Sequence, residues 1–164
     1  MDISAIKKMY DYHFAMHRKV WSNCIEALTD VQFITDLDYS KGSIRNQCLH
    51  LIGVDERWFA RIQGATLPDF PANEAYSTKA SVRARWDETE KNIIAYLDTL
   101  TDVDLSRILT FDMPHRGGSK TNQVWEILVH VINHGTDHRA QILAMLYQMG
   151  APTLEQDMIL YWWE

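Results

Sequence analysis

Apolar residues recur at intervals of three and four along four long segments of the chain, which is the period of an amphipathic helix. The segments cover residues 3–28, 43–62, 78–100 and 121–150. Each of the last three segments has a residue suited to an N-cap at its start: Ser43 in the first of them, Ser77 or Thr78 in the next, and Thr121 in the last. The pattern therefore predicts an all-α protein built as a four-helix bundle, with residues 1–164 forming a single domain.

The segments between the predicted helices are not predicted to be helical. Residues 29–42 form a connection that ends in SKGS, and Gly64, Pro68 and Pro71 interrupt the chain after the second helix. Within residues 106–114 apolar residues alternate with polar ones, and Gly-Gly follows. This pattern predicts a short extended segment or hairpin before the last long helix. The apolar tail DMILYWWE is expected to dock on the bundle or on a second subunit.

Composition and charge narrow the class of protein. Apolar residues make up 46% of the chain, enough for a packed core. The net charge is −6 with no basic run, which argues against nucleic acid as a partner. No apolar run approaches the roughly 18 residues of a membrane span, and the charged N-terminus does not resemble a signal peptide. We therefore expect a cytoplasmic protein. Cys24 and Cys48 are expected to be buried free thiols.

The stretch HVINHGTDH, residues 130–138, carries the clearest candidate chemistry. It places His130, His134 and His138 four residues apart on one helix, and imidazole is a good ligand for zinc, nickel and iron(II). At a rise of about 1.5 Å per residue, His130 and His138 lie about 12 Å apart along the axis. One ion cannot reach both, so it must use one neighbouring pair.

The apolar stripe of this helix chooses between the two pairs. With His130 at the origin and about 100° per residue, the stripe spans about 60° to 160°. His138 lies inside it near 80° and His134 at its edge near 40°, whereas His130 lies outside. Gly135 leaves space on the buried side. An ion inside the bundle should therefore use His134 and His138.

A third ligand must come from another helix, and the residues alone leave it open. His50 lies in the second helix, beside the apolar stripe. His13 and His17 form a second H-x-x-x-H on the apolar face of the first helix. Cys48 points roughly 200° away from His50 and cannot share its ion. His115 lies in a Gly-rich loop and is expected to be solvated.

The stretch HVINHGTDHRAQILAMLYQMG resembles the last-helix signature of the DinB/YfiT-like superfamily, roughly H-x-x-x-H-x-x-x-H-R-G-Q-I. His50 followed by Asp55 and Trp58 is similar to that family's H…D-x-x-W segment, and the LTF segment before the last helix also matches. Ala140 departs from the usual Gly, but both residues are small. The resemblance implies an up-down-down-up four-helix bundle and a divalent metal held by three histidines. Position by position, these are His50, His134 and His138, which leaves His13 and His17 to line the pocket or the core.

The resemblance also suggests a function. It implies a metal-dependent enzyme of the thiol S-transferase type, with a divalent ion, a low-molecular-weight thiol and a small electrophilic substrate. A homodimer is expected because relatives are often dimers. The alternative is a non-catalytic stress-response protein that binds metal or a small ligand. An open coordination position would favour the enzyme, and a fourth protein ligand such as His13 or His17 would favour the alternative.

No residue stands out as a general base. Four charged residues lie near the motifs, and a solvated helix face is expected to explain most of them: Asp55, Glu126, Asp137 and Arg139. Pairing with an acidic neighbour is the preferred reading of Arg139 over binding a substrate carboxylate. The catalytic residues therefore stay unassigned.

Overall fold

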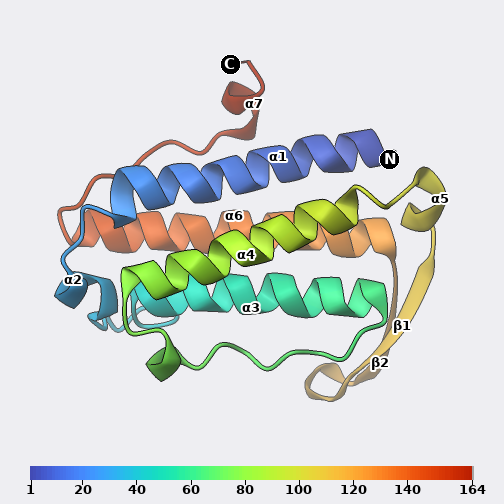
Figure 1. Cartoon of the computed structure of the whole chain (residues 1–164), viewed down its shortest axis with the longest axis horizontal. Coiled ribbons are helices and arrows are strands. Elements are labelled where there is room, and N and C mark those ends of the chain that lie inside the picture. Colours follow the sequence, from blue (N-terminus) through green and yellow to red (C-terminus); the bar gives the residue numbers. More distant parts are fainter. Residues whose placement is uncertain (164) are drawn as a thin grey trace.

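The computed structural model describes residues 1–163. Four long helices lie side by side, with α6 packed against both α1 and α3, and α3 also against α4 (Figure 1). Their bounds are Ile3–Val20 for α1, Ile44–Gln63 for α3, Lys79–Leu97 for α4 and Val124–Gln148 for α6. In Figure 1, α1 and α6 run in one direction and α3 and α4 in the other. Within residues 1–163, no helix is both long and apolar enough to cross a membrane.

The starts of two long helices are confirmed by their caps. Ser43 Oγ accepts from the amide of Asn46 at 3.2 Å and begins α3, and Thr78 Oγ1 accepts from Ser81 at 3.1 Å and begins α4. The predicted cap at Thr121 is wrong. Thr121 lies in a β-strand, and α6 begins at Val124, where the carboxylate of Glu126 accepts from the amide of Gln123 at 2.8 Å.

The first predicted helix is divided in the structure. After α1 the chain makes a π-helical turn at Trp21–Ile25, and the connection that follows contains a short helix, α2, Asp30–Ile34. Thr29 caps α2 by accepting from the amide of Gln32 at 3.2 Å. The segment after α3 holds one 3-10 turn, Asn73–Ala75. The apolar period thus predicts the long helix well but not where its hydrogen-bonding pattern changes.

A β-hairpin separates α4 from α6 and corrects the all-α expectation, since the protein is mostly helical with a small two-stranded sheet. After the short helix α5, Asp102–Leu105, strands β1 (Ile108–Met113) and β2 (Gly118–Gln123) pair antiparallel. A 3-10 turn at Pro114–Arg116 joins them, and Gly117 and Gly118 follow with φ of 83° and 89°. Residues other than glycine rarely adopt this left-handed backbone conformation, so the Gly-Gly pair suits the hairpin turn. The predicted extended segment is confirmed.

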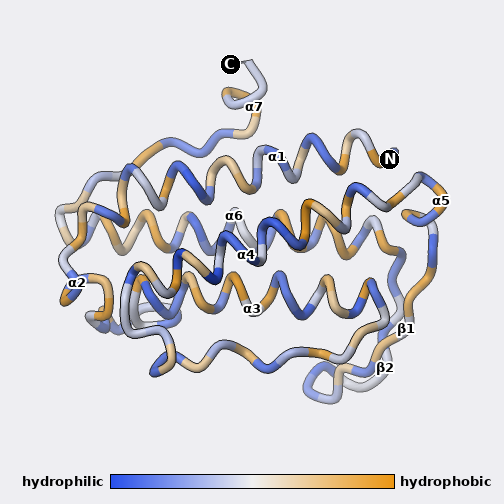
Figure 2. Tube along the Cα trace, viewed as in Figure 1, coloured by the Kyte–Doolittle hydropathy of each residue, from blue (hydrophilic) through white to orange (hydrophobic). Residues whose placement is uncertain are grey.

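Apart from a small cluster of Tyr12, Ala15 and Met16, the core of the described residues consists of two apolar clusters with a polar layer between them. One gathers around residues 20–28, 44–52 and 142–146, and the other around residues 6–14, 59–62 and 124–132. Figure 2 shows the corresponding alternation of apolar and polar positions along the long helices. Between the clusters lie buried polar side chains: His13, His17, Asp55 and Arg139. Cys24 and Cys48 are buried and free, as expected.

The described part of the tail docks on the protein's own first helix. It forms the short helix α7, Met158–Tyr161, and Tyr161 Oη donates to Asp11 Oδ2 at 2.7 Å. The ring centroids of Tyr161 and Tyr12 are 5.7 Å apart. Docking of the tail on the bundle is therefore observed as far as Trp162, whose ring faces Lys8, whereas the homodimer stays a prediction.

Candidate metal centre

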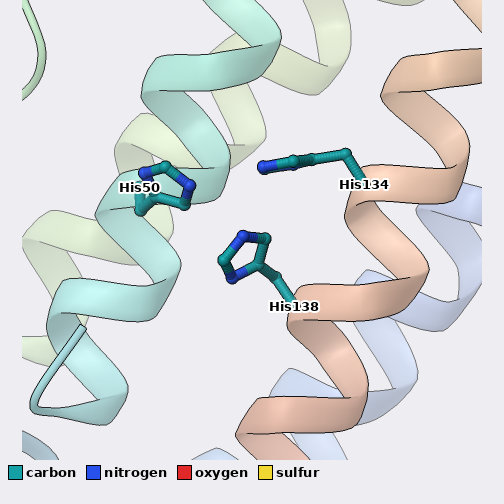
Figure 3. Close-up of side chains that lie close together, drawn as sticks. All are labelled: His50, His134 and His138. Carbon is teal, nitrogen blue, oxygen red and sulfur yellow. The ribbon is translucent and has the colours of Figure 1, made fainter. Parts of the chain in front are cut away.

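His50 from α3 and His134 and His138 from α6 come together between the two helices (Figure 3). One ring nitrogen from each lies within 4.8 Å of the other two. The ring centroids are 4.4 Å apart for His134 and His138, 4.6 Å for His50 and His138, and 5.2 Å for His50 and His134. The structure thus gathers all three predicted ligands into what we call the three-histidine group.

A glutamine that the sequence reasoning missed orients one of these rings. Gln47 Oε1 lies 2.8 Å from His138 Nδ1, while Gln47 Nε2 donates to Gln141 Oε1 at 3.0 Å. The amide therefore presents its oxygen to the imidazole, which places the proton of neutral His138 on Nδ1 and the lone pair on Nε2. Metal-ligating histidines are commonly held by such an acceptor. Gln47 precedes His50 by three residues, so both project from one face of α3, and this spacing is the available signal.

Half-buried Gln141 and two exposed residues complete the network around Gln47. Gln141 Nε2 donates to Asp137 Oδ2 at 3.1 Å, and Ser40 Oγ also bonds Gln141 Oε1. Asp137 is exposed, as expected for a solvated helix face. The acceptor on His138 is therefore fixed by a chain of side chains that reaches the surface.

His50 and His134 are in the protonation state that a metal ligand needs. Burial, with smaller contributions from Lys41 and the other two histidines of the group, lowers the pKa of His50 to about 3. Burial likewise lowers the pKa of His134 to about 4. Nδ1 of His134 is buried and has no hydrogen-bond partner within residues 1–163, so no protein group commits that ring to one tautomer. Neutral imidazoles with available lone pairs fit a divalent ion.

The remaining histidines outside the core do not join the group. His130 is exposed, and its ring packs edge-on against Trp58 at 5.4 Å. It lies 5.9 Å from the ring of His134, as a flanking residue. His115 is exposed at the hairpin turn. Both positions agree with the expectations from helix geometry and loop composition.

A second group that could hold a metal ion lies in the polar layer itself. We call it the buried His–Asp group: His13 and His17 from α1 and Asp55 from α3, with one ligand atom of each within 4.8 Å of the others. All three are buried, and His13 Nε2 lies 3.9 Å from Asp55 Oδ2. The structure therefore does not use His13 or His17 to complete the three-histidine group.

Hydrogen-bond donors set the tautomers in the buried His–Asp group. Trp86 Nε1 donates to His17 Nδ1 at 3.1 Å, and Arg139 Nη1 lies 3.3 Å from His13 Nδ1. Indole and guanidinium nitrogens can only donate, so both Nδ1 atoms accept and the proton of each neutral ring lies on Nε2. A protonated Nε2 cannot ligate a metal. These tautomers place two N–H groups, rather than lone pairs for a metal, beside the Asp55 carboxyl, and within residues 1–163 His13 Nε2, His17 Nε2 and both carboxyl oxygens have no hydrogen-bond partner.

Asp55 and Arg139 correct the expectation of a solvated face. Asp55 is 1% exposed and Arg139 is fully buried. Burial raises the pKa of Asp55 well above its usual value, against the opposing effect of Arg139. Arg139 forms no ion pair with a carboxylate within residues 1–163; it donates to Gln156 Oε1 and to Thr136 Oγ1, each at 3.0 Å. Both residues belong to the polar layer because their positions on α3 and α6 face α1 rather than solvent.

Gly135 allows α6 to approach the first helix closely. A Cβ built at Gly135 would lie 2.2 Å from His13 Cε1 and 2.8 Å from His13 Nδ1. The space that sequence analysis assigned to the buried side of α6 is thus filled by the imidazole of His13. The glycine next to His134 consequently keeps the two histidine groups adjacent.

Known proteins share this fold and are similar in sequence over most of the chain. The family model described as the DinB family matches residues 3–164. Protein DinB of Bacillus subtilis strain 168 is 29% identical over 160 residues, covering 94% of this chain and 91% of that protein. A DinB-like protein from Bacillus cereus has a similar fold, with a TM-score of 0.66, 19% identity, and coverage of 94% of this chain and 97% of that one.

A second solved structure shows the same fold. It is a DinB family member from Shewanella denitrificans, with a TM-score of 0.57 and 17% identity, covering 95% of this chain and 88% of that one. At these identities the two structures support the fold alone. The match of the family model covers nearly the whole chain, and the chain therefore belongs to the DinB family.

Proposed function

We propose that this protein is a divalent-metal-dependent enzyme that transfers a low-molecular-weight thiol to a small electrophile. The observation that carries the proposal is the orientation of His138, whose Nδ1 faces the acceptor oxygen of Gln47 and whose Nε2 is left for an ion. His50 and His134 bring the nearest further nitrogens. The frame that we assign to this site is the up-down-down-up four-helix bundle.

The donor set supports a catalytic rather than a structural ion. Within residues 1–163, the three-histidine group has no fourth protein ligand, and His50 and His134 are partly exposed. Three neutral ligands leave the +2 charge of a zinc, nickel or iron(II) ion uncompensated. Such an ion would supply Lewis acidity that lowers the pKa of a bound thiol or water and polarises an electrophile.

The protein's own residues would hold and shape this site. Gln47 fixes the ring of His138, and Phe70 lies parallel to His50, with ring centroids 6.0 Å apart and planes 12° apart. The aromatic ring limits the access of water on that side of His50. A small molecule would then reach the ion between α3 and α6, on the side where the histidines are exposed.

The metal is tested first, with protein purified without a histidine tag. We expect about one equivalent of divalent metal per chain, and we expect His134→Ala to abolish it. Full occupancy in that variant would refute the ligand assignment. Metal analysis of the two proteins, prepared in parallel, gives the answer.

The reaction is tested on metal-loaded protein with cysteine, glutathione, coenzyme A and mercaptoethanol, each with a general electrophile. We expect metal-dependent consumption of at least one thiol and loss of that rate in His134→Ala. Loaded protein that is inactive with every thiol would contradict the transferase and favour a non-catalytic protein that binds metal or a small ligand.

A further inference from the structure

A cleft of about 420 Å³ opens beside the three-histidine group. It lies between the second half of α3, the segment that follows α3, and the tip of the β1–β2 hairpin, which approach one another in Figure 1. Phe70 is 51% exposed and, with Trp58, forms an apolar part of its lining. Three guanidinium groups surround the rest: Arg57, Arg61 and Arg116. We call this site the arginine cleft.

The charge of the arginine cleft is opposite to that of the chain. The chain carries a net charge of −6, whereas the lining of the cleft has three arginines and one carboxylate, Asp112. In the described residues, 1–163, none of the three arginines lies within 4.0 Å of a carboxylate oxygen. Arg57 donates to the carbonyl of Pro68, and Arg61 lies 3.6 Å from Met113 Sδ. Within residues 1–163, their positive charge is thus not neutralised by a direct ion pair.

Two of these charges are placed against each other. Arg57 and Arg61 are four residues apart on α3, and like charges at this spacing destabilise a helix. Burial lowers the pKa of Arg61, and the charge of Arg57 lowers it further, so the two groups interact. An acidic residue at either position would relieve the repulsion. The pair therefore has a structural cost that a ligand of opposite charge would offset.

Aromatic faces hold the two guanidiniums in place. Arg57 lies 4.9 Å from the ring centre of Phe70, and Arg61 lies 4.8 Å from that of Trp58. Stacking of this kind uses the face of the guanidinium and leaves its edge N–H groups for an oxyanion. The cleft thus offers fixed donors next to an apolar surface.

Phe70 joins the arginine cleft to the metal centre. Its ring lies parallel to that of His50 while Arg57 stacks on it, so one side chain contacts both sites. A Cβ built at Gly53 would lie 2.5 Å from Phe70 Cδ1, which shows that the ring rests directly on the backbone of α3. A molecule long enough to extend past the ring of Phe70 could therefore occupy both sites at once.

The geometry points to an oxyanion-binding subsite, in which the arginine cleft holds a carboxylate or phosphate carried by the small molecule that reacts at the three-histidine group. The reaction of the bound molecule rests on the proposed function, whereas the binding of an oxyanion to the arginine cleft does not. Arg57 and Arg61 bind the oxyanion through their N–H edges, and Phe70 and Trp58 contact the apolar part. Arg116, at the hairpin tip, adds a third positive charge.

Binding is tested by NMR titration of metal-free full-length protein, dialysed free of chelator, with benzoate, phenyl phosphate and the neutral analogue benzyl alcohol. We expect saturable shifts of the Arg57 and Arg61 Nε–H signals with the anions and none with benzyl alcohol. Arg57→Gln and Arg61→Gln should each weaken anion binding about tenfold or more, as expected for charge-assisted hydrogen bonds. Arg45→Gln, which removes the same charge from α3 outside the cleft, should leave it unchanged. The stronger of the two anions identifies the group that the cleft prefers.

Equal shifts with benzyl alcohol, or unchanged anion affinity in both variants, would overturn the oxyanion subsite. On the metal-loaded protein, the variants should raise KM for mercaptopropionate and not for mercaptoethanol if the thiol carries the anion. Turnover without any effect of these variants on anion binding or KM would reject the subsite and keep the transferase. Anion binding at Arg57 and Arg61 without turnover of any thiol would reject the transferase and keep the subsite.

Discussion

The three-histidine group and the buried His–Asp group are built from nearly the same types of side chain, but their imidazole rings make different hydrogen bonds. Each takes two residues from an H-x-x-x-H pair on one helix and one residue from α3. In the first, an acceptor, Gln47, faces Nδ1 of His138. In the second, the donors Trp86 and Arg139 face Nδ1 of His17 and His13. One arrangement leaves a lone pair on Nε2, and the other leaves a proton there.

The difference teaches that ligand type and spacing do not make a metal site by themselves. Both groups would satisfy a search for nearby histidines and carboxylates, yet only the first presents an unprotonated nitrogen that the protein has oriented. The buried His–Asp group instead connects α1 and α3 in the layer between the apolar clusters, and its polar atoms lie among residues that are almost fully buried. We expect the two groups to respond differently to the same kinds of substitution.

The largest effect is expected from removing one member of each group. His138→Ala should lower metal affinity by more than the 10–100-fold that outer partners contribute, because it deletes a direct ligand. His17→Gln, which keeps an acceptor for Trp86, should leave about one equivalent of metal bound. Competition with a chromophoric chelator measures both. A metal content that falls with His17→Gln would show that the buried His–Asp group also binds an ion.

Gly135→Ala should destabilise the protein by about 2 kcal/mol or more, because overpacking a filled site costs roughly 1–3 kcal/mol and the added methyl meets His13 Cε1 at 2.2 Å. Urea unfolding of the metal-free protein measures the loss. Combining Gly135→Ala with His13→Ala provides the space, so the double variant should lose less than the sum of the singles. Additive losses would mean that the methyl and the imidazole do not compete.

Gln47→Leu should weaken metal binding by about 10–100-fold while the fold is retained, since it removes the acceptor that orients His138. Gln47→Glu keeps an acceptor oxygen at that position and should recover most of the affinity. Isothermal titration with zinc compares the three proteins. If the Gln47→Leu and Gln47→Glu variants bind zinc with equal affinity, the argument that Gln47 sets the tautomer of His138 fails.

Asp55→Asn should change how stability depends on pH. The raised pKa of Asp55 means that the folded state keeps its proton to higher pH than the unfolded state does. Raising the pH from about 4 towards that pKa therefore lowers the free energy of unfolding of the unsubstituted protein by up to about 1.4 kcal/mol per unit. The asparagine variant lacks this loss, so its stability relative to the unsubstituted protein should rise with pH. Urea titrations of the metal-free proteins from about pH 4.5 to about 7.5 measure the difference, and parallel profiles would contradict it.

Local signals in the sequence predicted much of the helical fold. Ser43 and Thr78 were placed correctly because an N-cap acts on an amide three residues away in the same chain segment. Thr121 was misplaced because it pairs with Thr110 across the hairpin, and strand pairing overrode its capping preference. Asp55 and Arg139 were expected at the surface because charged residues usually lie there, and only the packing of α6 against α1 and α3 buries them.

For the candidate site, the sequence by itself determined which pair of histidines on the last helix could share an ion. Helical rise and the apolar stripe depend only on order along the chain, and they selected His134 with His138. The tertiary structure decided which of His13, His17 and His50 lies beside that pair, and it brought Gln47 to His138 across 91 residues and Trp86 to His17 across 69. A ring nitrogen takes its tautomer from whatever atom lies about 3 Å away. That atom comes from another helix, so the periodicity of one helix cannot reveal it.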